Sequence, residues 1–187
     1  MVTAAKDVKL QVEFNPVHVS AWRLIGYDNR RLNDADFAND AKDAGDLGAG
    51  HAITALYELA PPSASDAGSY GVKLKYQEPP AAQTGHAEEV ATVKIRYKEP
   101  TASSSRELQF AVAHGLQDAP SPDFRFAAGV AQFGMVLRDS AHRGSASLDS
   151  AVQLVEDAIG EDADGLRAEF VYLAKLARDL QRATARR

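Results

Sequence analysis

Six aspartates between positions 28 and 46 form a cluster of carboxylates that could bind a hard cation such as calcium. They are Asp28, Asp34, Asp36, Asp40, Asp43 and Asp46, and Arg30, Arg31 and Lys42 offset half of their charge. A calcium site needs about six to eight converging oxygens, and the spacing of an EF-hand loop does not occur here. We therefore expect a solvated loop whose aspartates form turns and cap helices, with no metal site and no cofactor in this chain.

His51 follows the glycine-rich run GDLGAG and is the one histidine with notable acidic neighbours. A phosphate-binding loop needs its glycines after a strand and before a helix, together with a lysine and a hydroxyl. Here the glycines precede a predicted strand, so we interpret the run as a tight turn and His51 as structural. A deep pocket that brings His51 together with Asp43 and Asp46 would instead indicate an enzyme or a small-ligand site.

The remaining patterns of catalytic chemistry do not occur in the sequence. The histidines are His18, His51, His86, His114 and His142, and no two have the spacing of a zinc-binding helix. The sequence has no cysteine, and no serine lies in a G-x-S-x-G turn. We therefore expect a protein that is not an enzyme, and we name no catalytic, cofactor-binding or metal-ligating residue.

Composition narrows the class of partner. The chain has 187 residues, a net charge of −5 and a pI near 5.5, whereas nucleic-acid-binding domains are usually basic. No apolar run approaches the roughly 20 residues that span a bilayer. We expect no nucleic-acid partner and no direct membrane insertion by this chain.

The elements that must position these side chains differ between the two halves. In the first half, apolar and polar residues alternate, which predicts strands with one wet face. The predicted strands cover residues 8–14, 17–27, 51–59, 72–76, 93–97 and 107–112. Lysines and arginines on the outer faces should discourage edge pairing. We expect residues 1–115 to form an antiparallel β-sandwich.

The second half changes to a helical period. Ser121, Pro122 and Asp123 are typical of a helix start. Three apolar stripes follow: Phe126, Val130, Phe133 and Leu137; then Leu148, Val152, Val155 and Ile159; then Leu166, Phe170, Leu173, Ala177 and Leu180. We expect residues 116–187 to form a bundle of about three helices, packed on or beside the sandwich, which makes the chain an α+β protein.

Several stretches resemble the C-terminal region of YfbK-type bacterial von Willebrand factor A (VWA) domain proteins. They are AKDVKLQVEFNP (5–16), RLIGYDNR (23–30), KDAG (42–45), GAGH (48–51), TALYE (54–58), PDFRFAA (122–128), FGM (133–135) and RAEF (167–170). The resemblance covers nearly the whole chain. It implies that the chain follows a VWA domain in a longer protein of the bacterial cell envelope, periplasmic or anchored through an upstream segment.

The VWA metal motif D-x-S-x-S does not occur in this chain. Any divalent metal of such a protein would therefore belong to its upstream VWA domain. Two functions follow from these patterns. The first is a non-catalytic accessory module that supports the adjacent VWA domain or binds other proteins. The second is an enzyme or small-ligand domain centred on His51 and the Asp28–Asp46 loop.

Overall fold

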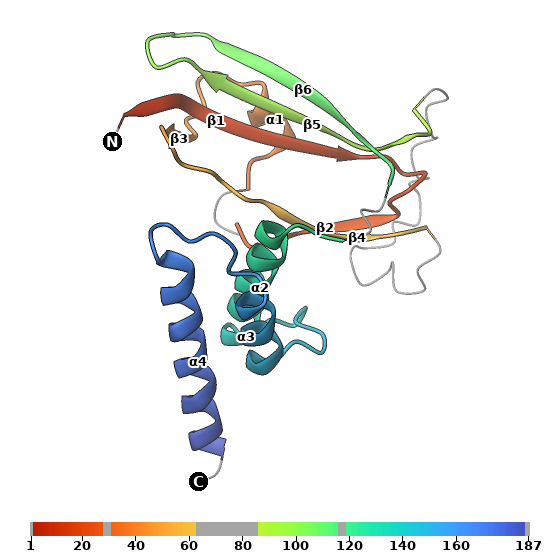
Figure 1. Ribbon diagram of the computed structural model, residues 1–187. Coiled ribbons are helices and arrows are strands. Elements are labelled where there is room, and N and C mark those ends of the chain that lie inside the picture. Colours follow the sequence, from red (N-terminus) through yellow and green to blue (C-terminus); the bar gives the residue numbers. More distant parts are fainter. Residues whose placement is uncertain (1, 28–30, 63–85, 116–118, 186–187) are drawn as a thin grey trace. The chain divides into compact units, whose positions relative to one another are not determined.

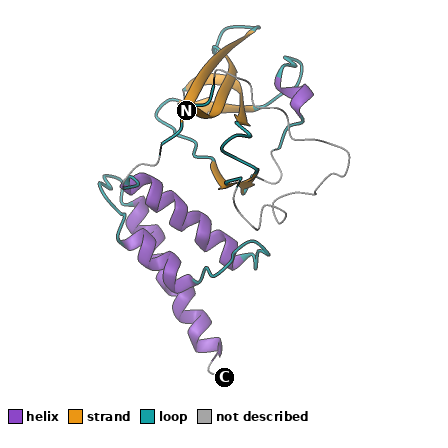
Figure 2. Cartoon of the chain, turned by 90° about the vertical axis from the view of Figure 1, so that its right-hand side faces the viewer, coloured by secondary structure: helices purple, strands orange, loops and turns teal. Residues whose placement is uncertain are grey.

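The computed structural model describes residues 2–27, 31–62, 86–115 and 119–185, and it contains two compact units, Met1–Leu116 and Gln117–Arg187. Figure 1 shows the described strands in the first unit and three long helices in the second. The short helix α1 (Asp34–Phe37) lies beside the strands of the first unit (Figure 2). Antiparallel strands followed by helices confirm the predicted α+β class.

The main sheet has four antiparallel strands in the order β3-β1-β5-β6. Their bounds are Thr3–Phe14 for β1, Gly45–Gly48 for β3, Glu89–Lys98 for β5 and Ser105–Ala113 for β6. The register places Leu10, Ile95 and Leu108 in one row, which fixes one apolar face. Lys9, Arg96 and Glu107 form a row of the opposite, polar face.

A second sheet pairs β2 (Ala21–Ile25) with β4 (Leu56–Ala60). It contacts the apolar face of the main sheet through an aromatic cluster. The ring of Phe14 on β1 lies 5.6 Å from that of Trp22 and 5.3 Å from that of Tyr57. Two sheets that face each other across apolar side chains make the first unit a sandwich, with its aromatic core at one end of β1.

The structure corrects the bounds of two predicted strands, and a third predicted strand lies outside the described residues. The strand predicted from His51 begins only at Leu56, and Ile53, predicted to face the core, is 64% exposed. The strand predicted at 17–27 is shortened to Ala21–Ile25, and residues 72–76 lie outside the described residues. Neither α1 nor β3 was predicted from the sequence, because each is only four residues long and β3 lies in the glycine-rich run that was interpreted as a turn.

The second unit contains α2 (Pro122–Leu137), α3 (Leu148–Glu156) and α4 (Leu166–Ala185). The predicted cap is confirmed, since the Ser121 side chain accepts a hydrogen bond from the Phe124 N–H at 3.1 Å. Val152 and Val155 of α3 are fully buried. Rings from α2 and α4 meet edge to face, with Phe170 lying 5.8 Å from Phe126 and 5.3 Å from Phe133.

The predicted apolar stripe of α4 is wrong at its leucines. Leu166, Leu173 and Leu180 are at least half exposed, whereas Val171 and Ala174 are buried. Val130 and Leu137 of α2 are likewise exposed, although Phe126 and Phe133 pack as predicted. These helices therefore bury narrower faces than a full amphipathic stripe would require.

Among the described residues, none of the helices is both long enough and apolar enough to cross a membrane.

Candidate functional site

The aspartate-rich segment lies against the polar face of the main sheet, and a buried lysine connects the two. Lys9 of β1 is only 3% exposed. Its Nζ donates hydrogen bonds to the backbone carbonyl oxygens of Asp36, at 3.1 Å, and Asn39. The alternation on β1 predicted Lys9 in solvent and Leu10 in the core, yet Leu10 is 46% exposed. That expectation was wrong because α1 and the turn after it cover the polar face at this point.

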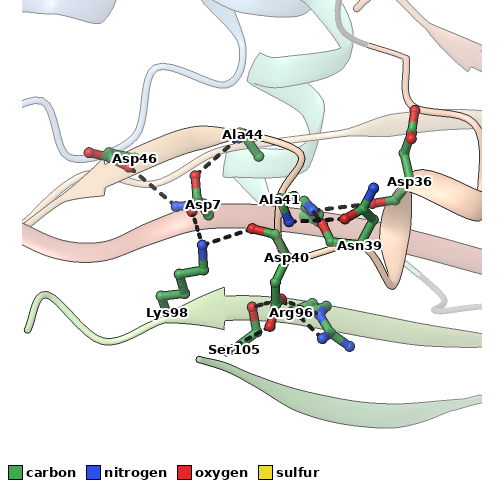
Figure 3. Close-up of polar contacts among 11 residues, drawn as sticks. Asp7, Asp36, Asn39, Asp40, Ala41, Ala44, Asp46, Arg96, Lys98 and Ser105 are labelled. Atoms are coloured by element: carbon green, nitrogen blue, oxygen red, sulfur yellow. Dashed lines mark hydrogen bonds and ion pairs between the residues drawn. The ribbon is translucent and has the colours of Figure 1, made fainter. Parts of the chain in front are cut away.

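Asp40 connects the same segment to β5 and β6 (Figure 3). Its Oδ1 accepts hydrogen bonds from Arg96 Nη2 at 3.0 Å and from Arg96 Nε at 3.3 Å, and from the Ser105 hydroxyl. The hydrogen bond from Ser105, and then that from Arg96, lower the pKa of Asp40 to about 2. The carboxylate therefore stays ionised and paired at ordinary pH.

Asp7 makes the third connection from an unusual backbone position. Its φ is +50°, at a register shift in the pairing of β1 with β5. Its Oδ2 accepts from Lys98 Nζ at 2.7 Å, its Oδ1 accepts from the Ala44 N–H at 3.2 Å, and its own N–H donates to Asp46 Oδ1 at 3.2 Å (Figure 3). The hydrogen bond with Lys98 lowers the pKa of Asp7 and raises the pKa of Lys98.

These contacts decide what the aspartate cluster can do chemically. Asp7, Asp40 and Asp46 point at cations and N–H groups of the chain rather than toward one common point. Across the described ranges, no group of three or more histidine, aspartate or glutamate side chains is placed to hold a metal ion. We call this set of contacts, made by Asp7, Lys9, Arg96 and Lys98 with one another and with residues 36–46, the aspartate clasp. It is an arrangement that fixes a loop to a sheet.

The structure does not bring the predicted ligand-site residues together. The backbone N–H of His51 donates to the Gly48 carbonyl at 3.1 Å, in a turn where Gly50 has φ +79°. The predicted glycine turn is therefore present only at the end of the run, since Gly45–Gly48 forms strand β3. The side chains of His51 and Asp43 are exposed, and the structure gives neither a hydrogen bond nor an ion pair between them. Asp28 lies outside the described residues.

A second histidine arrangement was missed by the sequence analysis. The rings of His18 and His114 stack at 4.1 Å, and His18 Nε2 lies 2.6 Å from the carbonyl oxygen of Ala87. The nearby Asn15 amide donates to the carbonyls of His86 and Glu89. The sequence did not indicate that these histidines and Asn15 lie together, because they come from three separate loops and strand ends.

A line of leucines on α4 forms an exposed apolar surface of the second unit. We define the leucine ridge as Leu166, Leu173, Leu176 and Leu180, all of which are exposed. Their spacing of seven, three and four residues places them on one side of a helix, opposite the buried Val171 and Ala174. Leu166, Leu173 and Leu180 of this line were predicted from the sequence to face the core, and this prediction was wrong.

Residues 1–180 match the family described as "Uncharacterized protein YfbK, C-terminal". The chain is also 41% identical, over 178 residues, to "Uncharacterized protein YfbK" of Escherichia coli (strain K12). The chain belongs to the YfbK C-terminal family. The match covers 95% of this chain and 30% of the relative, so the chain spans less than a third of the relative's length. No solved structure matches the chain significantly.

Proposed function

We propose that this YfbK C-terminal chain is a non-catalytic interaction module that supports an adjacent VWA domain of the same parent protein. The leucine ridge of α4 is the observation that carries the proposal. A row of exposed leucines on one helix face is typical of a surface that docks on another apolar surface.

The polar contacts of α4 strengthen this interpretation. Lys175 forms an ion pair with Glu156, and Arg178 and Arg182 form ion pairs with Asp149. All of these acidic residues belong to or flank α3. The cations of α4 are thus directed at its neighbour, while its leucines are directed away. α4 therefore carries an exposed apolar face in addition to the one buried at Val171 and Ala174, and this exposed face favours a further partner on the leucine side.

The aspartate clasp favours a supporting rather than a catalytic role. A general acid or base needs a titratable group that can reach a substrate. Asp7 and Asp40 are each held by a cation of β5. We propose that any divalent cation of the parent protein is bound by the VWA domain.

The share of YfbK that this chain matches is consistent with a partner domain elsewhere in the same protein. The matched region is 30% of the E. coli protein, and the family description places it at the C-terminal end. We further propose that the parent is held in the bacterial cell envelope, periplasmic or membrane-anchored, by a segment outside this chain.

Co-purification tests the proposal. The chain would be produced with an affinity tag together with the proposed adjacent VWA domain of its own parent protein, as a separate polypeptide. We expect the two to co-purify, and we expect Leu173→Glu with Leu180→Glu to abolish co-purification because two charges would enter an apolar contact. The matched control is Gln181→Glu, an exposed polar position of the same helix.

Circular dichroism of each variant shows whether the helices remain folded. The proposal fails if the wild-type pair does not co-purify. It also fails if the folded double-glutamate variant binds as well as the control.

A further inference from the structure

An uncovered strand lies at the edge of the main sheet. β6 pairs with β5 and has no second neighbour among the described strands, as Figure 1 shows. Residues 106–113 of this strand are all exposed. A nine-residue edge strand presents a row of backbone donors and acceptors over roughly 30 Å, which is a ready template for another strand.

β6 lacks the features that normally prevent such pairing. Its sequence, SRELQFAVA, contains neither proline nor lysine. Its two charged residues are already engaged within the chain, since Arg106 pairs with Glu99 at 2.8 Å and Glu107 lies 3.9 Å from Arg96. Of the lysines expected to protect the sheet, Lys9 and Lys94 are on β1 and β5, which are interior strands, and Lys73 and Lys75 lie outside the described residues.

We propose that a second copy of this chain pairs antiparallel along β6, with Phe110 opposite the Phe110 of its partner. The pairing joins the two four-stranded sheets into one continuous sheet about a two-fold axis. The proposal is independent of the leucine ridge, because it involves a different unit of the chain.

The register follows from side-chain complementarity. In a two-fold pairing centred on Phe110, Leu108 lies opposite Val112 of the partner, so the centre of one face is apolar. Arg106, at the end of the same face, lies opposite His114. On the other face Gln109 meets Ala111, and Glu107 meets Ala113. No like charges are opposed. A pairing centred on Gln109 would instead place Arg106 opposite Val112 and interrupt the apolar face.

The rest of the sheet fits the same arrangement. Two rows of apolar side chains cross the sheet and end at β6 in exposed residues, and Phe110 is 52% exposed. The rows are Leu10–Ile95–Leu108 and Val12–Val93–Phe110. Across the two-fold axis these rows would continue into those of the partner. Phe110 would then gain an aromatic neighbour in place of water.

A charge-swap experiment tests this contact. Sedimentation velocity of the full chain should give a dimer of the 20.1 kDa protomer. Phe110→Glu and Phe110→Lys should each weaken association at least ~100-fold, because like charges would lie directly opposite each other. An equal mixture of the two variants should restore a dimer, since only a residue that meets itself gives opposite charges in the mixture.

Leu10→Glu is the matched control, because Leu10 is similarly exposed on the same face but lies on an interior strand. We expect this variant to dimerise like the wild type, with circular dichroism showing that all variants are folded. A monomeric wild type at millimolar concentration overturns the proposal. Dissociation by Leu10→Glu would indicate association through the sheet face, and a mixture that stays monomeric would exclude the Phe110-centred register. Either result overturns the proposal.

Discussion

Gly129 of α2 lies so close to Val155 of α3 that a β-carbon at position 129 would stand 2.5 Å from the Cγ1 of Val155. Val155 is fully buried and its backbone nitrogen would be 3.3 Å away, so neither atom can easily move. The absence of a side chain at 129 is therefore what lets the two helices approach.

We expect Gly129→Ala to destabilise the second unit by about 1–3 kcal/mol. The overpacking cost should exceed the roughly 1 kcal/mol that alanine gains over glycine inside a helix. Gly134→Ala in the same helix is the control, because nothing lies within 4 Å of its added β-carbon. We expect it to stabilise by about 0.5–1 kcal/mol. Urea unfolding followed by helical circular dichroism measures both, and equal effects would contradict the close contact.

Replacing the buried lysine should cost the first unit more than replacing an ordinary strand lysine. Lys9→Met keeps the apolar stem but leaves the carbonyls of Asp36 and Asn39 without their donor. We expect a loss of about 1–3 kcal/mol. Lys94→Met, on the same face of the sheet, should cost under about 0.5 kcal/mol. Fluorescence of the single tryptophan, Trp22, reports the unfolding of this unit in urea. A loss as small for Lys9→Met as for Lys94→Met would show that the Lys9 contacts add nothing.

The aspartate clasp should make the first unit sensitive to acid. The pKa of Asp40 is lowered from 3.8 to about 2, so its stabilisation is present above the higher value and is lost as the pH falls toward the lower one. We expect Asp40→Asn to lose less stability in acid than the wild type does. Part of the loss should remain, because the pKa of Asp7 is also lowered.

Ser105→Ala provides the intermediate case. It removes the hydrogen bond that contributes most to the low pKa of Asp40, so the loss of stability in acid should be smaller than in the wild type, larger than in Asp40→Asn, and complete at a higher pH than in the wild type. Urea midpoints by Trp22 fluorescence between about pH 6 and pH 2 measure these differences. Parallel profiles for the wild type and Asp40→Asn would contradict the assigned role of Asp40.

The face that α4 buries can be tested by truncating neighbouring residues. We expect Val171→Ala to cost about 2 kcal/mol, because two buried methyl groups are lost. Leu173→Ala removes more carbon but from a half-exposed position, so it should cost under about 1 kcal/mol. Thermal unfolding of the two variants shows which substitution costs more stability. A larger cost for Leu173→Ala would support the buried face that the sequence predicted.

Local patterns predicted the element types where they were strong. Some signals depend only on neighbouring residues and could be identified without knowledge of the fold. They are the alternation in β1, β5 and β6, and the helix start at Ser121 and Pro122. The strand predicted from His51 failed because alternation alone does not require a pairing partner, and β2 reaches only as far as Leu56 of β4.

Which face is covered could not be predicted in the same way. Alternation shows that Lys9 and Leu10 point to opposite sides, but the burial of Lys9 depends on α1, which comes from a distant part of the sequence. The helical period groups Leu166, Leu173 and Leu180 equally well, yet the structure buries Val171 and Ala174 instead. The partners of Asp7 and Asp40 are up to 91 residues away, so no spacing rule could have identified them.

The long sequence separation between the aspartates and their cations also sets the order in which these contacts form during folding. Lys98 and Arg96 reach the aspartates only after β5 has paired with β1, and closing so long a loop is a slow, non-local step. Until then the carboxylates of residues 36–46 have no cations from β5 and repel one another. The segment that carries α1 should therefore dock after the central strands have formed, which makes it a late addition to the sheet rather than part of its nucleus.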